Sequence, residues 1–252
     1  MQPERTLPSG WTQVPLASLA ADGSVTYGVV QPGKAVSGGV PMVRVNNFRG
    51  FGLDTTDVLS IAADVEAKYS RTRLRVNDVL ITVVGTVGQV AVVPPALAGW
   101  NVARAVAVVR PKDATLARWI ALALRAPEAQ RALGVAANTT VQTTINLKDL
   151  RKLPIPMPER HEREAIELLL GGLDDRIDLL RQTNATLESI AQALFKSWFI
   201  DFDPVHAKQA GREPEVGRGR VGAEPVAVDH RASAVADGER PAAGGPGAGL
   251  PG

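Results

Sequence analysis

Residues 173–208 read LDDRIDLLRQTNATLESIAQALFKSWFIDFDPVHAK, and this stretch decides the fold. Its apolar residues recur at alternating spacings of three and four, and the pattern begins upstream at Ile166. Such a seven-residue repeat is typical of a coiled-coil seam rather than of the broader stripe of a helix on a globular core. The seam consists of Ile166, Leu170, Leu173, Ile177, Leu180, Asn184, Leu187, Ala191, Leu194 and Trp198. The sequence therefore predicts one long helix that pairs with another helix, with an ordinary long surface helix as the alternative.

The partner of this helix is expected to lie outside the chain. One helix cannot bury its own seam, and the sequence holds a single copy of the repeat. A second chain, identical or different, must then supply the partner, unless a shorter helix of the first segment covers the seam. Asn184, the polar residue near the midpoint, costs stability when buried but can set the register of the pair.

The residues upstream of the helix are rich in strands. The β-branched runs are VLITVVG (79–85), QVAVVP (89–94) and VARAVAVVRP (102–111), and glycines between the first two allow a hairpin turn. Residues 114–133 change to a helical period, which Pro127 divides. We expect an α+β fold, in which residues 1–157 form a strand-rich mixed domain, residues 158–203 form the long helix, and residues 204–252 form a disordered tail.

Charge is distributed unevenly along the chain, whose formal net charge is +2. Residues 1–157 carry 17 Lys and Arg against 10 Asp and Glu, whereas residues 158–202 carry 5 against 9. A basic body with an acidic appendage favours contact between the body and a polyanion, with ordinary solvation as the alternative.

Catalytic motifs are not found. The chain has no cysteine, which excludes thiol nucleophiles and thiolate metal sites, and its three histidines lack the spacing of a zinc site. Neither a phosphate-binding loop nor a serine-nucleophile motif is present, so we expect a binding protein with no catalytic and no metal residues. The N-terminus does not read as a signal peptide, which favours a cytoplasmic location.

The long helix and its flanks closely resemble the specificity (S) subunit of type I restriction–modification systems. The residues that carry the resemblance are LPSGW (7–11), NDVLITVVGTVGQVAVV (77–93), INLKDLRKLPIPMP (145–158) and the run from Leu173 to Lys208. The resemblance implies a target recognition domain at 1–157 and a spacer helix at 158–203. Because such subunits carry two recognition domains and two helices, this chain corresponds to a half-length form, with residues 204–252 as a possible truncated or frameshifted remnant.

The resemblance also implies the partners. They are double-stranded DNA, methyltransferase (M) and restriction (R) subunits, and a second half-specificity chain joined through the helix. No cofactor is expected in this chain, because S-adenosylmethionine, ATP and Mg would be bound by partner subunits. The implied function is that of a non-catalytic subunit that reads one half of a bipartite DNA target.

Candidate DNA contacts come from polar or basic loop stretches, because arginine suits phosphates and guanine while Asn and Gln suit adenine. Asn46 and Asn47 could instead shape a turn, and the alternating arginines could form the solvated face of a strand. Thr82, Thr86 and Gln89 are interpreted as hairpin-stabilising residues. The candidates are Arg44, Asn46, Asn47, Arg49, Arg71, Arg73, Arg75, Thr139, Thr140, Gln142 and Thr144.

Three other functions remain open from sequence. The chain could be a stand-alone dimeric DNA-binding regulator, a coiled-coil interaction adaptor, or a non-functional truncated specificity subunit. An adaptor should not bind duplex DNA, and a regulator should bind it without methyltransferase.

Overall fold

The computed structural model describes residues 7–50, 52–137 and 144–211. The chain divides into two compact units, and the boundary between Thr186 and Leu187 falls within the long helix α6 (Arg160–Phe195). The first unit contains the strand-rich domain, as the sequence predicts.

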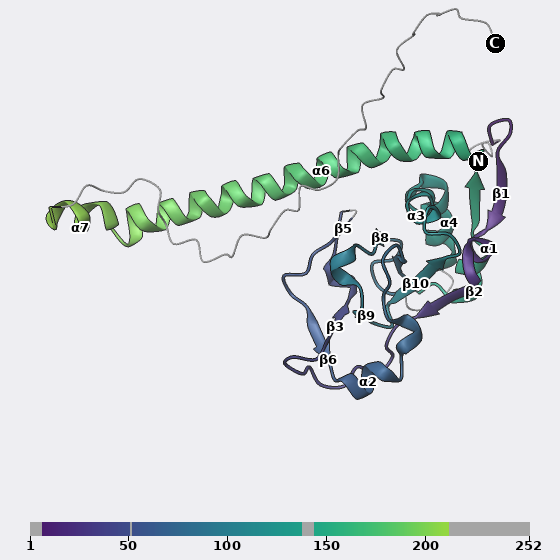
Figure 1. Cartoon of the computed structure of the whole chain (residues 1–252), viewed down its shortest axis with the longest axis horizontal. Coiled ribbons are helices and arrows are strands. Elements are labelled where there is room, and N and C mark those ends of the chain that lie inside the picture. Colours follow the sequence, from purple (N-terminus) through teal and green to yellow (C-terminus); the bar gives the residue numbers. More distant parts are fainter. Residues whose placement is uncertain (1–6, 51, 138–143, 212–252) are drawn as a thin grey trace, which may run out of the picture. The chain divides into compact units, whose positions relative to one another are not determined.

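A four-stranded sheet in the order β2-β10-β7-β8 forms the centre of the first unit (Figure 1). All neighbouring strands are antiparallel. The predicted hairpin is confirmed, since β7 pairs with β8 and places Leu80 opposite Ala91. The strands are β2 (Ala20–Tyr27), β7 (Val79–Thr82), β8 (Val90–Val92) and β10 (Val106–Pro111).

Both faces of this sheet are buried at β7, β8 and β10, which explains why these three strands read as nearly unbroken apolar runs. Successive side chains of a strand point to opposite faces, so Val79 and Ile81 join the larger core while Leu80 joins the smaller one. Four helices contribute residues to the larger core. These are α1 (Leu16–Leu19), α3 (Leu116–Arg125), α4 (Pro127–Ala137) and α5 (Leu147–Lys152).

Two smaller sheets lie next to the central one. In the three-stranded sheet, β3 pairs with β6 in the antiparallel sense and with β9 in the parallel sense, and β4 pairs with β5 in a two-stranded ribbon. Their bounds are β3 (Val40–Val43), β4 (Phe48–Arg49), β5 (Gly52–Leu53), β6 (Leu59–Ile61) and β9 (Asn101–Val102). Short helices join them: η1 (Val45–Asn47), α2 (Ala63–Ala67), η2 (Ser70–Thr72) and η3 (Pro95–Leu97).

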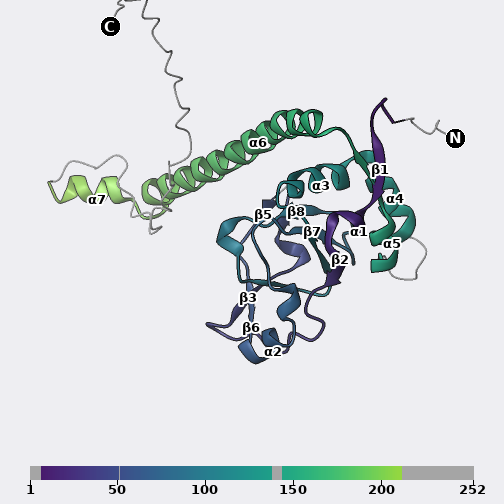
Figure 2. The same ribbon diagram turned by 45° about the vertical axis from the view of Figure 1, so that its right-hand side comes forward.

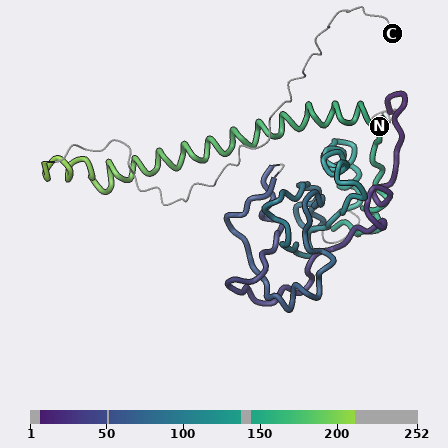
Figure 3. The backbone as a smooth tube through the Cα atoms, in the orientation of Figure 1, coloured from purple at the N-terminus to yellow at the C-terminus, as the bar shows by residue number. Residues whose placement is uncertain are grey.

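The start of the domain pairs with the segment that leads into α6 (Figure 3). Strand β1 (Thr12–Pro15) runs antiparallel to β11 (Pro154–Met157). Trp119 Nε1 donates a hydrogen bond to the carbonyl of Pro156 in β11 at 2.8 Å. Trp11 Nε1 donates to Glu162 Oε2 in the first turn of α6 at 3.0 Å, and Ile166 packs against the larger core. The first turns of α6 are therefore anchored to the domain by both polar and apolar contacts.

The second unit, as far as residue 211, contains the end of α6 and two further elements. A π-helical turn, η4 (Lys196–Ile200), follows α6, and α7 (Asp203–Gln209) comes next. Phe202 adopts a left-handed conformation with φ 52°, which ends the first helix, and Pro204 occupies the first turn of α7, where its missing N–H is not needed. The prediction of a disordered tail at 204–252 is wrong for residues 204–209, which are helical in α7. Residues 212–252 of the predicted tail lie outside the described part of the chain.

Candidate nucleic-acid interface

A groove of about 540 Å³ brings together three segments that are far apart in the sequence. Backbone hydrogen bonds join them: Ala103 N donates to the carbonyl of Val43 at 2.9 Å, and Val83 N donates to that of Ala105 at 2.8 Å. The groove therefore sits on a backbone framework rather than on free loops. Its lining residues are Arg44, Val45, Asn46, Phe48, Arg49, Thr86, Gln89, Ala103 and Ala105.

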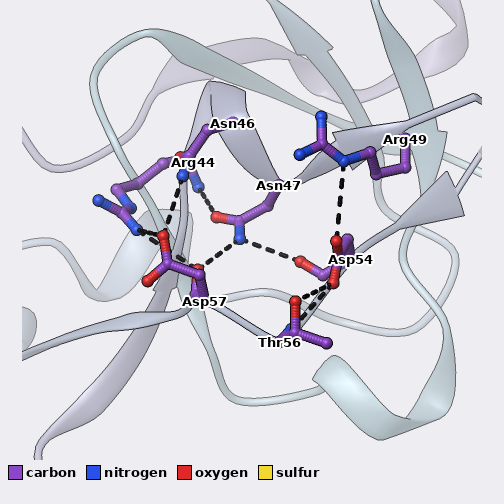
Figure 4. Close-up of polar contacts among 7 residues, drawn as sticks. All are labelled: Arg44, Asn46, Asn47, Arg49, Asp54, Thr56 and Asp57. Atoms are coloured by element: carbon purple, nitrogen blue, oxygen red, sulfur yellow. Dashed lines mark hydrogen bonds and ion pairs between the residues drawn. The ribbon is translucent and has the colours of Figure 1, made fainter. Parts of the chain in front are cut away.

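Asn47 holds the loop that forms one wall of this groove (Figure 4). Its side chain is buried, with Oδ1 accepting a hydrogen bond from Arg44 N at 2.8 Å. Its Nδ2 donates to the carbonyls of Asp54 at 3.0 Å and Asp57 at 2.8 Å. These bonds use both N–H donors of the amide and one of the two lone pairs on its oxygen. Asn47 therefore shapes the loop, which is one of the two roles that the sequence left open.

Arg44 and Asn46 share one acidic partner in the same loop. Arg44 Nη2 lies 3.1 Å from Asp57 Oδ2, and Asn46 Nδ2 donates to the same oxygen at 3.3 Å (Figure 4). The Asp57 side chain is 80% exposed, so both contacts exchange with water and can be replaced by contacts to a ligand.

Arg49 is the most available cation of the groove. Its side chain is 71% exposed, and its Nε lies 3.7 Å from Asp54 Oδ2, beyond hydrogen-bond distance. The Asp54 carboxylate instead accepts hydrogen bonds from the backbone N and the hydroxyl of Thr56, which hold the pKa of Asp54 below its usual value. Arg49 can therefore turn towards a phosphate without leaving a buried charge behind.

Gln89 has two roles in the structure. Its backbone N donates to Thr82 Oγ1 at 3.0 Å, which stabilises the hairpin as the sequence suggests. Its side chain lines the groove, and the carboxamide makes no hydrogen bond to any described residue. A second hollow of about 170 Å³ is also lined by Gln89, together with Gly50, Gly88, Val90, Arg125 and Gln130.

Sequence reasoning missed this role of Gln89 and of its neighbour Thr86, which is exposed. The two glycines of the hairpin loop, Gly85 and Gly88, have φ of 77° and 88°, the left-handed region that favours glycine. These glycines indicate a tight loop, but only the fold shows that the loop faces Arg49 across a groove.

The three alternating arginines are not in a strand and do not line the groove. Arg73 forms a two-pronged ion pair with Glu66, at 2.8 Å and 2.5 Å. The hydrogen bonds from Arg73 lower the pKa of the buried Glu66 carboxyl, and Asn101 adds a further contact at 3.3 Å. Arg71 and Arg75 are exposed, and their side chains contact no charged partner among the described residues.

The polar patch after α4 is only partly described. Thr139, Thr140 and Gln142 lie outside the described residues. Thr144 forms an isolated antiparallel bridge with Val84, and Ile145 N donates to the carbonyl of Val83 at 2.9 Å. The end of this patch is therefore attached to the hairpin loop that carries Thr86.

The candidate pairing residues of α6 are exposed beyond its first turns. Ile166 is partly buried against the core, whereas Leu173 is 61% exposed and Leu187 is 58% exposed. Asn184 and Ala191 are exposed as well. Exposure of 38–50% is seen at Leu170, Ile177, Leu180 and Leu194 of α6 and at Trp198 of η4. Within the described first unit, no shorter helix covers the seam side chains from Leu170 to Asn184, so the structure does not contain the internal partner that the sequence left open for this part of the helix.

Two further kinds of site are absent from the described residues. No group of three or more His, Cys, Asp or Glu side chains there is placed to hold a metal ion. Over the same residues, no helix combines the length and apolar character that a membrane crossing requires.

Comparison with known proteins supports one family. The chain is 27% identical over 199 residues to the EcoBI type I restriction enzyme specificity subunit of Escherichia coli, covering 77% of this chain and 42% of that protein. It is 48% identical over 64 residues to the HindI specificity subunit of Haemophilus influenzae, covering 25% of this chain and 14% of that protein. The chain thus spans less than half the length of the curated relatives it matches.

Solved structures show the same fold. A type I restriction–modification S subunit from M. genitalium matches with a TM-score of 0.54 at 18% identity, over 84% of this chain and 52% of that one. A chain from a study of complex assembly and conformational transition of the type I R-M system matches with a TM-score of 0.53 at 22% identity, over 78% and 46%. The family model described as type I restriction modification DNA specificity domain matches residues 9–189. The chain therefore belongs to the family of type I restriction–modification DNA specificity domains.

Proposed function

We propose that this chain reads one half of a bipartite DNA target through the groove between Arg44 and Gln89. The observation that carries the proposal is that one groove is lined both by Arg49, an exposed cation, and by Gln89, whose carboxamide makes no hydrogen bond to the described residues. Arg49 suits a phosphate, which positions a protein on duplex DNA, while the Gln89 carboxamide suits the N6 and N7 edge of adenine. Ala103 and Ala105 supply small apolar surface next to Gln89, which suits the methyl group of the paired thymine.

Reading a complete target requires a second recognition domain, which we propose is contributed by another chain through α6. The exposed seam supports this, because removing its half-exposed leucines from water under a partner helix lowers the free energy of the pair. The partner is a second copy or a different half-specificity chain. Asn184 of one copy would meet its symmetry mate in an antiparallel pair.

Docking of methyltransferase subunits is the further part of the proposal. The aromatic end of the helix supports it: Phe195 and Phe199 stack with ring centroids 5.2 Å apart and are 58% and 62% exposed, and Trp198 is 45% exposed. Exposed aromatic clusters are enriched at protein interfaces. Methyl transfer from S-adenosylmethionine and ATP-dependent restriction would then belong to the M and R partners, and this chain would supply sequence recognition alone.

Binding to a fluorescent duplex of mixed sequence tests the DNA-reading role before the target is known. We expect Arg49→Ala to weaken binding and to reduce the slope of log affinity against log salt by about one phosphate contact. Arg160→Ala is the matched control, because Arg160 is also an exposed arginine but pairs with Glu164 within α6. Equal binding by Arg49→Ala and the unchanged chain would contradict the groove, and absence of duplex binding by the unchanged chain would favour an interaction adaptor.

A further inference from the structure

The first half of α6 is joined to the recognition domain by two ion pairs with α3. Arg125 Nη1 donates to Asp174 Oδ2 at 2.7 Å, and both side chains are largely buried, with 17% and 22% exposed. Arg118 Nη2 donates to Asp175 Oδ1 at 3.2 Å in a more exposed pair. Figures 1 and 2 show α3 next to this part of α6 in both views.

Gly171 allows this close approach. It is the buried residue of α6, and a Cβ atom at this position would lie 2.1 Å from Cζ of Arg118. The guanidinium group of Arg118 therefore occupies the space that any other residue at position 171 would fill. The glycine and the two aspartates form one surface of the helix, since positions separated by three or four residues share a face.

The same side of α6 also reaches the loop that carries Arg49. A Cβ atom at Gly50 would lie 2.1 Å from Nη1 of Arg181, so this guanidinium group lies against Gly50, directly after β4. A Cβ at Gly52 would lie 3.9 Å from Oδ2 of Asp178. Gly171, Asp174 and Asp175 therefore face α3, while Asp178 and Arg181 face the glycines that follow Arg49.

The seam lies on a different side of the helix from these contacts. Leu173 and Leu180 are 61% and 50% exposed, although they alternate along the chain with residues that touch the domain. The helix can therefore hold the recognition domain on one side while offering the seam to a partner on another.

We propose that Asp174 and Asp175, held by Arg125 and Arg118, are positioning residues that hold the first part of the pairing seam, from Ile166 to Asn184, at one orientation relative to the DNA-reading groove. We call these two ion pairs between α3 and α6 the joint. Its consequence rests on the proposed function: the joint sets the separation of two half-sites on DNA. Asp174 contributes more than Asp175 to holding this orientation, because its ion pair with Arg125 is shielded from water and is less screened by salt.

The joint can be measured directly, without DNA, by pulsed electron spin resonance. The chain has no cysteine, so nitroxides can be placed on Ala67→Cys in α2 and Gln182→Cys in α6, with unlabelled chain in excess to remove distances between copies. We expect one narrow distance distribution, which broadens at least twofold in the Asp174→Asn, Asp175→Asn double variant. Glu164→Gln is the matched control, because the ion pair of Glu164 with Arg160 lies within the helix.

Rescue separates positioning from general destabilisation. Exchanging the charges, Arg125→Asp with Asp174→Arg, should narrow the distribution again, whereas each single change should broaden it. A broad distribution in the unchanged chain, or a narrow one in the double Asn variant, would overturn the inference. Duplex binding by one recognition domain should be the same in the double Asn variant as in the unchanged chain. If the unchanged chain does not bind duplex DNA, the proposed function is contradicted, but the distance measurement still tests the ion pairs.

Discussion

Asp78 and Arg110 form a two-pronged ion pair inside the recognition domain, with Oδ1 at 2.9 Å from Nε and Oδ2 at 2.9 Å from Nη2. The pair joins the residue before β7 to the end of β10. The Asp78 side chain is 2% exposed, and its Oδ2 also accepts a hydrogen bond from Arg75 N at 2.8 Å. The hydrogen bonds to Asp78 raise the pKa of Arg110 above its usual value.

Removing the arginine of this pair should be costly. Arg110→Ala leaves the Asp78 carboxylate buried without its counter-charge, and breaking a buried pair on one side costs about 3–5 kcal/mol. Arg131→Ala is the control, because its pair with Glu128 is exposed on both sides and should be worth about 0–1 kcal/mol. Urea unfolding measures both, and a loss for Arg110→Ala no larger than for the control would refute the structural role of the pair.

The Glu66–Arg73 pair predicts a loss of stability in acid. Hydrogen bonds from Arg73 hold the pKa of Glu66 below its ordinary value of 4.5 in the folded chain, while burial opposes them. Because the unfolded chain takes up the proton at higher pH, the stabilisation is complete above about pH 4.5 and is lost as the pH falls through the folded pKa.

Glu66→Gln tests this linkage. The variant should be less stable than the unchanged chain near neutral pH, and the difference should shrink as the pH falls below about 4.5. The unfolding midpoints of both chains should be measured across this pH range. A difference in stability that stays constant with pH would show that the charge of Glu66 does not cause it.

The neighbouring amides of the groove wall should behave differently. Asn47→Ala removes partners from Arg44 N and from the carbonyls of Asp54 and Asp57, so we expect a loss of about 2–3 kcal/mol in unfolding free energy. Asn46→Ala removes one exposed contact and should change stability by less than about 0.5 kcal/mol. Thermal unfolding of the two variants side by side would contradict this account if their losses were equal.

Much of the fold could be predicted from sequence because its signals are local. The hairpin of β7 and β8, the division of α3 from α4 at Pro127 and the length of α6 all follow from β-branched runs, proline chemistry and a seven-residue repeat. The joint could not be predicted in this way. Asp174 and Asp175 carry no local signal that distinguishes them from other charged residues of the helix, and only the approach of α3 makes them partners of Arg125 and Arg118.

The site was harder to predict than the fold for the same reason. Asn47 and Arg73 have the residue types that read DNA, yet their hydrogen bonds serve the loop and Glu66. Gln89 was assigned to the hairpin because its sequence neighbours are turn residues, and its place opposite Arg49 depends on backbone pairing between distant segments. Residue type indicates possible contacts, whereas long-range pairing decides which side chains remain available.

The seam predicts self-association that can be removed without unfolding the domain. Changing Leu173, Leu180 and Leu187 to Asp places charges along the expected helix interface and should convert a dimer into a monomer. Circular dichroism should change little, because these side chains are 50–61% exposed and add nothing to the domain core. Light scattering gives the mass, and a monomer before the changes would exclude pairing with a second copy and leave a different half-specificity chain as the partner.

Sequencing the duplexes that the intact chain retains from a randomised pool tests the central claim most directly. The account predicts one short enriched element containing an A·T pair, present in two copies when chains are paired. Gln89→Ala should lose the preference at that pair, while Gln13→Ala, which alters a glutamine of β1 outside the groove, should keep it. The account would be contradicted by retained duplexes that share no element, or by an element that Gln89→Ala leaves unchanged.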